Sequence, residues 1–140
     1  MSIDLHPFLE RLLQATNAHD LDALVDCFNG DYRNETPTHP ARSFAGPEQV
    51  RKNWQQIFGY VPDVSARVVG RAVDGTELWS EWEMSGTRLD GTPHLMRGVI
   101  IFGLRDGRAS SARFYLEPVD AAATTVDEAV SHQVHAGGRP

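Results

Sequence analysis

The segment "ELWSEWEMSGTRLDGTPHLMRGVIIFGLRDGR" (residues 77–108) alternates apolar and polar side chains along two runs, each of which leads into an Asp-Gly turn. Alternation with a period of two is typical of β-strands, and Asp-Gly is the dipeptide that tight hairpin turns prefer. We therefore predict strands over residues 77–88 and 94–105. The same pattern predicts neighbouring strands over 64–73 and 108–117, so that four antiparallel strands form a meander.

Before residue 64 the apolar side chains recur with the period of a helix. They predict three short helices, around residues 5–13, 21–28 and 47–58, and the proline-containing segment 31–40 is predicted to be extended. Three helices followed by a meander indicate an α+β fold in which the helices pack on one face of a curved sheet. We predict one domain over residues 1–119, and a mobile tail over 120–140 with a helical turn near Val126–Val130.

Composition excludes several classes of function. The net charge is −6 and the 13 Lys and Arg form no run, so no nucleic-acid partner is expected. No apolar stretch approaches the roughly 20 residues of a membrane span. The one cysteine, Cys27, is predicted to be a buried structural thiol, which is typical of a reducing cytoplasm. The six histidines are scattered, and no glycine-rich phosphate loop precedes a helix, so neither a metal nor another cofactor is expected.

The order of these elements, together with "NAHDLDALVDCF" (17–28), "EWEMSGTRLDGTP" (81–93), "RGVIIFGLRDGR" (97–108) and "RFYLEP" (113–118), resembles the SnoaL-like branch of the nuclear transport factor 2-like superfamily. The resemblance implies a cone-shaped fold, in which a bent sheet wraps around a helix and encloses a deep apolar pocket. It says little about activity, because the superfamily includes isomerases, dehydratases, cyclases, epoxide hydrolases and non-catalytic proteins.

An ungapped register with the limonene-epoxide hydrolases of that superfamily implies the positions of a catalytic site. Their water-binding tyrosine and asparagine correspond to Tyr32 and Asn34, and an acid on their second strand corresponds to Glu83. Two positions depart from their pattern, since Glu81 replaces an arginine and Phe114 replaces the second acid. The aspartate of the ketosteroid isomerases corresponds to Asn34, and the predicted strand 94–105 lacks their second acid.

Alternation divides strand 77–88 into two faces. On periodicity alone, Leu78, Ser80, Trp82 and Met84 form the core face, and the glutamates between them lie in solvent. The register of the resemblance instead places Trp79, Glu81, Glu83 and Ser85 toward the pocket, and we adopt that orientation. Two enclosed glutamates about 6.5 Å apart cannot easily both ionise, so that one becomes a proton donor near neutral pH and the other a base.

The predicted function is therefore that of a cofactor-independent enzyme, which binds a small apolar molecule and acts on it by acid/base catalysis. The catalytic residues would be Glu81, Glu83, Tyr32 and Asn34. The substrate-binding residues would be Trp54, Trp79, Ser85, Met96, Phe114 and Leu116. The alternative is a non-catalytic binding or dimerisation domain, which the phenylalanine at 114 favours. His39 and His94 are expected at the surface, as is a cluster of Arg113, Tyr115 and Glu117.

The predicted strand 94–105 is apolar on both faces, and three helices can cover only one of them. We therefore expect a homodimer through the outer face, centred on Leu95, Val99 and Ile101, with Arg97, Arg113 and Tyr115 nearby. In the rival arrangement, residues 120–135 fold back over the sheet and keep the protein monomeric.

Overall fold

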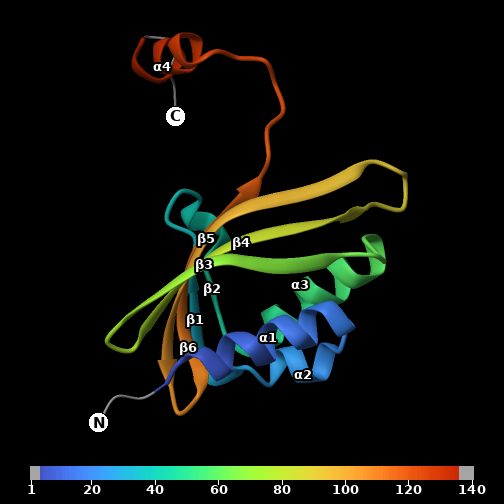
Figure 1. The fold of residues 1–140 in the computed structure, drawn as a ribbon, viewed down its shortest axis with the longest axis vertical. Helices are drawn as coiled ribbons and strands as arrows, with labels where there is room; N and C mark the ends of the chain where they lie inside the picture. Colours follow the sequence, from blue (N-terminus) through green and yellow to red (C-terminus); the bar gives the residue numbers. More distant parts are fainter. Residues whose placement is uncertain (1–3, 136–140) are drawn as a thin grey trace.

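The computed structural model describes residues 4–135 and shows an α+β fold with a curved six-stranded sheet (Figure 1). The helices are α1 (His6–Ala18), α2 (Leu21–Val25), the 3₁₀ helix η1 (Pro40–Arg42), α3 (Pro47–Tyr60) and α4 (Val126–Val134). The strands are β1 (Phe28–Glu35), β2 (Phe44–Ala45), β3 (Ser65–Asp74), β4 (Glu77–Thr87), β5 (Pro93–Arg105) and β6 (Arg108–Pro118). The predicted fold class is confirmed.

The sheet has the order β2-β1-β6-β5-β4-β3, so that the predicted meander forms its larger part. Asp106 and Gly107 both adopt positive φ between β5 and β6, which is the conformation that this type of turn requires. The predicted extended segment 31–40 begins inside β1. That strand pairs in parallel with β6, with Asn34 opposite Ala112, and it carries the short strand β2 on its free edge.

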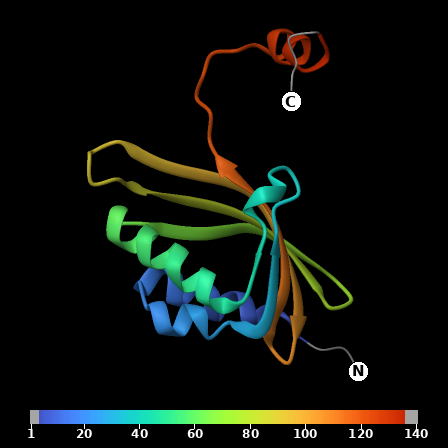
Figure 2. The ribbon, with the colours of Figure 1, turned by 180° about the vertical axis from the view of Figure 1, so that it is seen from behind.

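The three N-terminal helices pack on the concave face of the sheet, which we call the inner face (Figure 2). Phe8 of α1 is buried against Phe102 of β5, with ring centroids 4.9 Å apart. Asp20 caps α2 as predicted, because its carboxylate accepts a hydrogen bond from the Ala23 amide at 3.1 Å. Helix α1 ends at Ala18, and the next residue, His19, has a left-handed φ of 56°. Nε2 of His19 lies 2.7 Å from the Val64 carbonyl oxygen.

One helix was not predicted in full. The turn expected near Val126–Val130 is part of α4, which follows an irregular segment after β6. Figures 1 and 2 show α4 standing away from the body of the fold. The end of the predicted tail, residues 136–140, lies outside the described residues. Within residues 4–135, no helix combines the length and the apolar character needed to cross a membrane.

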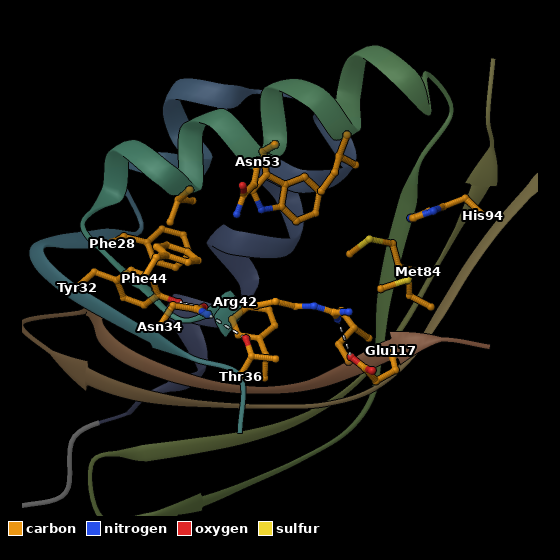
Figure 3. Close-up of a pocket in the computed structure, with 16 residues that line it drawn as sticks. Phe28, Tyr32, Asn34, Thr36, Arg42, Phe44, Asn53, Met84, His94 and Glu117 are labelled. Carbon is orange, nitrogen blue, oxygen red and sulfur yellow. Dashed lines mark hydrogen bonds and ion pairs between the residues drawn. The ribbon is translucent and has the colours of Figure 1, made fainter. Parts of the chain in front are cut away.

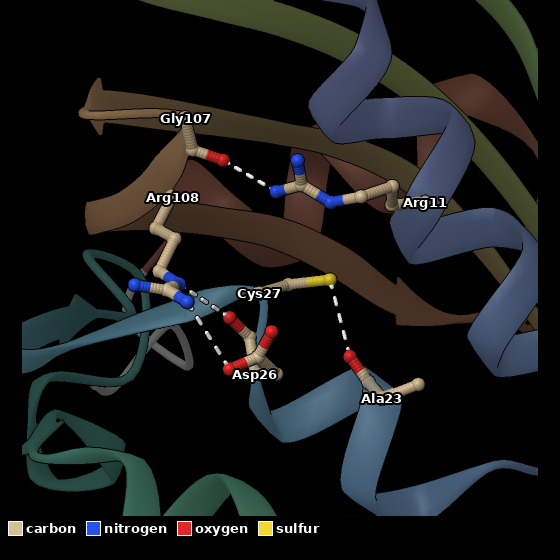
Figure 4. A network of polar contacts seen from close by, with 6 residues as sticks. All are labelled: Arg11, Ala23, Asp26, Cys27, Gly107 and Arg108. Atoms are coloured by element: carbon tan, nitrogen blue, oxygen red, sulfur yellow. Dashed lines mark hydrogen bonds and ion pairs between the residues drawn. The ribbon is translucent and has the colours of Figure 1, made fainter.

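Cys27 is buried where α2 runs into β1, as predicted. Its thiol donates a weak hydrogen bond to the Ala23 carbonyl at 3.5 Å, and burial raises its pKa (Figure 4). Around it, Arg11 donates to the Gly107 carbonyl and Arg108 donates to the Asp26 carbonyl. These bonds join α1, α2 and the β5–β6 turn, so Cys27 lies at a structural junction.

Candidate functional site

An apolar cavity of about 270 Å³ lies between α3 and the inner face of the sheet (Figure 3). Sixteen residues line it: Phe28, Tyr32, Asn34, Thr36, Arg42, Phe44, Val50, Asn53, Trp54, Ile57, Met84, His94, Met96, Phe114, Leu116 and Glu117. Helix α3 contributes side chains at the spacing i, i+3, i+4 and i+7, and most of the strand residues are separated by two positions. Glu117, which directly follows Leu116 on β6, departs from this alternation. The volume lies near the lower end of the range for ligand sites, which suits a small molecule.

A chain of buried polar side chains forms one wall of the cavity. The Tyr32 hydroxyl donates a hydrogen bond to the Asn34 side-chain oxygen at 2.8 Å, and the Asn34 amide donates a longer bond of 3.4 Å to the Thr36 hydroxyl. Alternation along β1 and just beyond it brings all three to the inner face. Burial raises the Tyr32 pKa, so the phenol stays protonated. In this series of hydrogen bonds, the Thr36 hydroxyl and one N–H of the Asn34 amide can still donate to a ligand oxygen.

The carboxylate of Glu117 lies on the cavity lining near the end of β6. It lies 2.7 Å from Nε2 of His39, and its other oxygen lies 3.8 Å from the Arg42 guanidinium. These contacts join the segment between β1 and β2 to the end of β6.

His94 contributes an imidazole to the cavity from the start of β5. Its pKa is lowered, first because burial disfavours the charged ring and second because the Arg88 guanidinium repels the added proton. A lowered pKa keeps this ring neutral near pH 7, and a neutral imidazole accepts protons.

The predicted orientation of β4 is wrong. Leu78, Ser80, Trp82 and Met84 are buried on the inner face, whereas Trp79 is 41% exposed on the opposite face of the sheet, which we call the outer face. Glu81, Glu83 and Ser85 lie on that outer face as well. There Arg67 donates two hydrogen bonds to Glu83, at 2.8 and 2.6 Å, and the Arg97 guanidinium lies 3.6 Å away on the other neighbouring strand.

The physical reason for this orientation is the relative cost of burial. Turning β4 over would remove the Glu83 carboxylate from its arginine partners, would remove both Glu81 and Glu83 from water, and would expose the buried apolar side chains of the other face. The ion pair with Arg67 lowers the Glu83 pKa instead of raising it. Glu81 and Glu83 are therefore surface residues and cannot form the enclosed acid/base pair that was predicted.

The structure brings six of the ten predicted site residues to the cavity: Tyr32, Asn34, Trp54, Met96, Phe114 and Leu116. Trp79, Glu81, Glu83 and Ser85 do not reach it. His94 was expected at the surface, but it lines the cavity. The Glu117 side chain is 39% exposed, as expected, and it also borders the cavity. A signal for His94 was present in the sequence, because alternation places it on the same face of its strand as Met96, Ile100 and Phe102. No sequence signal indicated that Glu117 approaches the segment between β1 and β2.

Among residues 4–135, no group of His, Cys, Asp and Glu side chains is arranged to hold a metal ion.

Comparison with known families identifies the chain. The family model of the SnoaL-like domain matches residues 9–112. The chain belongs to the SnoaL-like family. No protein with a curated description matches it.

Solved structures resemble this SnoaL-like protein in fold. One is IdmH, a candidate polyketide cyclase from Streptomyces antibioticus, with 20% identity, a TM-score of 0.70, and coverage of 81% of this chain and 92% of that chain. An LEH-like epoxide hydrolase from M. tuberculosis has 17% identity and a TM-score of 0.69, with 81% and 82% covered. A protein with a ketosteroid isomerase-like fold from Catenulispora acidiphila, in complex with trimethylamine, has 15% identity and a TM-score of 0.67, with 77% and 84% covered. At these identities the likeness concerns the fold alone.

Proposed function

We propose that this SnoaL-like protein is a cofactor-independent enzyme that binds a small, mostly apolar molecule in the cavity and acts on it by proton transfer. The observation that carries the proposal is the presence of His94 and Glu117 on an otherwise largely apolar lining. A partly buried imidazole such as that of His94 is costly to charge in a largely apolar cavity, and ionisable groups in such cavities are typical of catalytic sites.

Four polar residues of the cavity have roles in this proposal. His94, neutral near pH 7, accepts a proton from the substrate or from a water molecule. The Asn34 amide and the Thr36 hydroxyl donate hydrogen bonds to a carbonyl, ether or epoxide oxygen and so stabilise the charge that develops on it. Glu117, bound to His39 and Arg42, holds the loop that closes this side of the site. Isomerisation, cyclisation and epoxide opening are all compatible with these roles.

A matched pair of substitutions on β6 tests whether the cavity is the site. Leu116 faces the cavity, whereas its neighbour Tyr115 lies on the outer face. The wild type is screened against small enolisable ketones, by deuterium uptake at the α-carbon, and against small epoxides, by ring opening. We expect Leu116→Trp to fill the cavity and abolish the activity that is found, and Tyr115→Trp to retain it. Equal activity in the two variants would contradict the proposal.

The second candidate function is ligand binding without catalysis. It is favoured by the position of Glu117, whose carboxylate already contacts His39 and Arg42 and is therefore less available as a base. A wild type that binds apolar ligands but turns over no member of either substrate class would support this candidate.

We further propose a homodimer through the outer face, with its centre moved from the predicted one. Ile101 lies on that face but is only 4% exposed, because its cross-strand neighbours are Trp79 and Arg113, and Arg113 also bonds Glu77 at 3.2 Å. The exposed apolar groups are instead Trp79 and Tyr115, and Tyr115 lies directly opposite the half-buried Val99. Aromatic side chains exposed on an open sheet face are typical of protein interfaces. A reducing compartment such as the cytoplasm suits the buried free thiol of Cys27.

A further inference from the structure

Helix α4 carries an apolar face that has no partner in the structure. Val126, Val130 and Val134 follow one another at intervals of four residues and therefore share one side of the helix. They are 76%, 49% and 68% exposed. Both views of the ribbon show the helix apart from the sheet and from the other helices (Figures 1 and 2).

The sequence specifies this helix locally. Thr125 and Glu128 form a capping box, in which the Thr125 hydroxyl accepts from the Glu128 amide at 3.2 Å and the Glu128 carboxylate accepts from the Thr125 amide at 2.9 Å. Nonetheless, α4 has 9 residues, and isolated helices shorter than about 12–15 residues are marginal in water. A capped helix of this length, with a valine stripe, is stable when the stripe packs against another surface.

The segment that leads to α4 leaves the sheet beside the cavity. Leu116 and Glu117 line the cavity, and two residues later the Val119 amide donates a hydrogen bond of 3.0 Å to the Leu95 carbonyl. The six residues 120–125 span up to about 20 Å when extended. Leu89 lies six residues before Leu95 along the chain, so it is also at most about 20 Å from the place where Val119 bonds Leu95.

An apolar surface that could receive α4 lies within the reach of residues 120–125. Tyr60, at the end of α3, is 63% exposed, and Leu89, in the β4–β5 turn, is 66% exposed. The two are adjacent, because the Leu89 amide donates to the Tyr60 carbonyl at 3.1 Å. Neither side chain lines the cavity itself, but each lies close along the chain to a residue that does: Tyr60 follows Ile57 by three residues, and Leu89 precedes His94 by five.

Charge favours this surface over the outer face. Arg88, next to Leu89, makes no ion pair with a carboxylate of residues 4–135, and its charge acts on His94 inside the cavity. Helix α4 begins with Asp127 and Glu128. On the outer face, by contrast, arginines are already paired with Glu83 and Glu77.

We propose that α4 is a lid, which folds back over the cavity mouth of its own chain. In the closed form, Val126 and Val130 pack on Leu89 and Tyr60, and Asp127 approaches Arg88. The lid excludes water from the cavity and controls the entry and release of ligands. The proposal goes beyond catalysis, since a pure binding protein would use the same lid.

Disulfide trapping in the full-length chain tests the closed form. Leu89→Cys combined with Val126→Cys places two thiols at the proposed contact, and Trp79→Cys with Val126→Cys is the matched control for the outer face. Cys27 is buried in each variant, so it forms a constant background. Each protein is oxidised mildly with copper phenanthroline and examined by non-reducing electrophoresis and intact mass.

We expect the 89/126 pair to form a disulfide within one chain, at least about tenfold faster than the 79/126 pair. An 89/126 rate no greater than that of the control would overturn the proposal. So would a disulfide that forms only between chains, because α4 would then cover a second copy. Faster trapping of the 79/126 pair would show that α4 covers the outer face instead.

Discussion

The Arg67 guanidinium lies 2.6 Å from the Glu83 carboxylate, on the side of β4 that faces away from the cavity. This pair shows that Glu83 belongs to the surface, and alternation along the strand places Glu81 on the same face. In the proposed reaction, proton transfer would therefore use other groups, and His94 and Glu117 are the imidazole and the carboxylate that line the cavity.

The first prediction concerns the protonation of His94. Burial and the Arg88 charge lower its pKa below 6.5, so its NMR titration midpoint should lie below that value. The unfolded chain then binds the proton more readily than the native one. Stability is therefore lost as the pH falls from 6.5 through the lowered native pKa. Urea unfolding at several pH values should show a smaller loss for His94→Gln. A midpoint at or above 6.5 would refute the prediction.

The second prediction concerns the polar wall of the cavity. Tyr32→Phe removes the bond to Asn34 and leaves a buried amide oxygen without its donor, which costs about 1–3 kcal/mol of unfolding free energy. The control is Tyr115→Phe on the outer face, which should change stability by less than about 0.5 kcal/mol. Urea denaturation measures the unfolding free energy of both variants. If Tyr32→Phe lowers it no more than the control does, the Tyr32 hydroxyl contributes nothing to stability.

The third prediction concerns Gly98 in the middle of β5. Its φ is 151°, and an added Cβ would come within 2.0 Å of the Tyr115 carbonyl oxygen. Gly98→Ala should therefore cost about 1–3 kcal/mol from backbone strain, and a similar amount from overpacking. Gly59→Ala in α3 is the control, since its Cβ meets nothing within 4 Å and helix propensity favours alanine by about 0.5–1 kcal/mol. Thermal unfolding should shift in opposite directions for the two variants.

The fourth prediction concerns assembly. Light scattering at micromolar concentration should give the wild type about twice the chain mass of 15.5 kDa. Val99→Glu places a charge between Glu81 and Tyr115 on the outer face and should yield monomers. Val73→Glu, at an exposed valine that shares the face of Leu78, should remain dimeric. A wild-type mass near 15.5 kDa that does not change on dilution would exclude the dimer.

The elements of the fold could be predicted because their signals are local. Asp-Gly turns and alternation located β3 to β6, and apolar spacing located α1 to α3. The pairing of β1 with β6 was not predictable in this way, because the partners lie almost 80 residues apart and their polar sequences do not specify a register. Helix α4 was underestimated because its capping box lies in a segment rich in Ala and Thr.

The site was predicted in part, and Tyr32 and Asn34 were indicated by the register of the resemblance, not by a local signal. Tyr32 and Asn34 reached the cavity, as did the apolar positions on α3, β5 and β6. The error at β4 came from preferring a register borrowed from distant relatives over the periodicity of the strand itself. Three buried apolar side chains and two glutamates that stay hydrated determine which face of β4 is turned inward, and the alternation of the sequence records this preference.

The most direct measurement compares two single substitutions on the first substrate that the screen identifies. We predict that His94→Gln lowers kcat by about 10²- to 10⁴-fold, the usual contribution of a general acid or base, while the substrate still binds. Glu83→Gln is the control on the outer face, and this variant should retain the wild-type kcat. Loss of turnover in Glu83→Gln together with full turnover in His94→Gln would contradict the account.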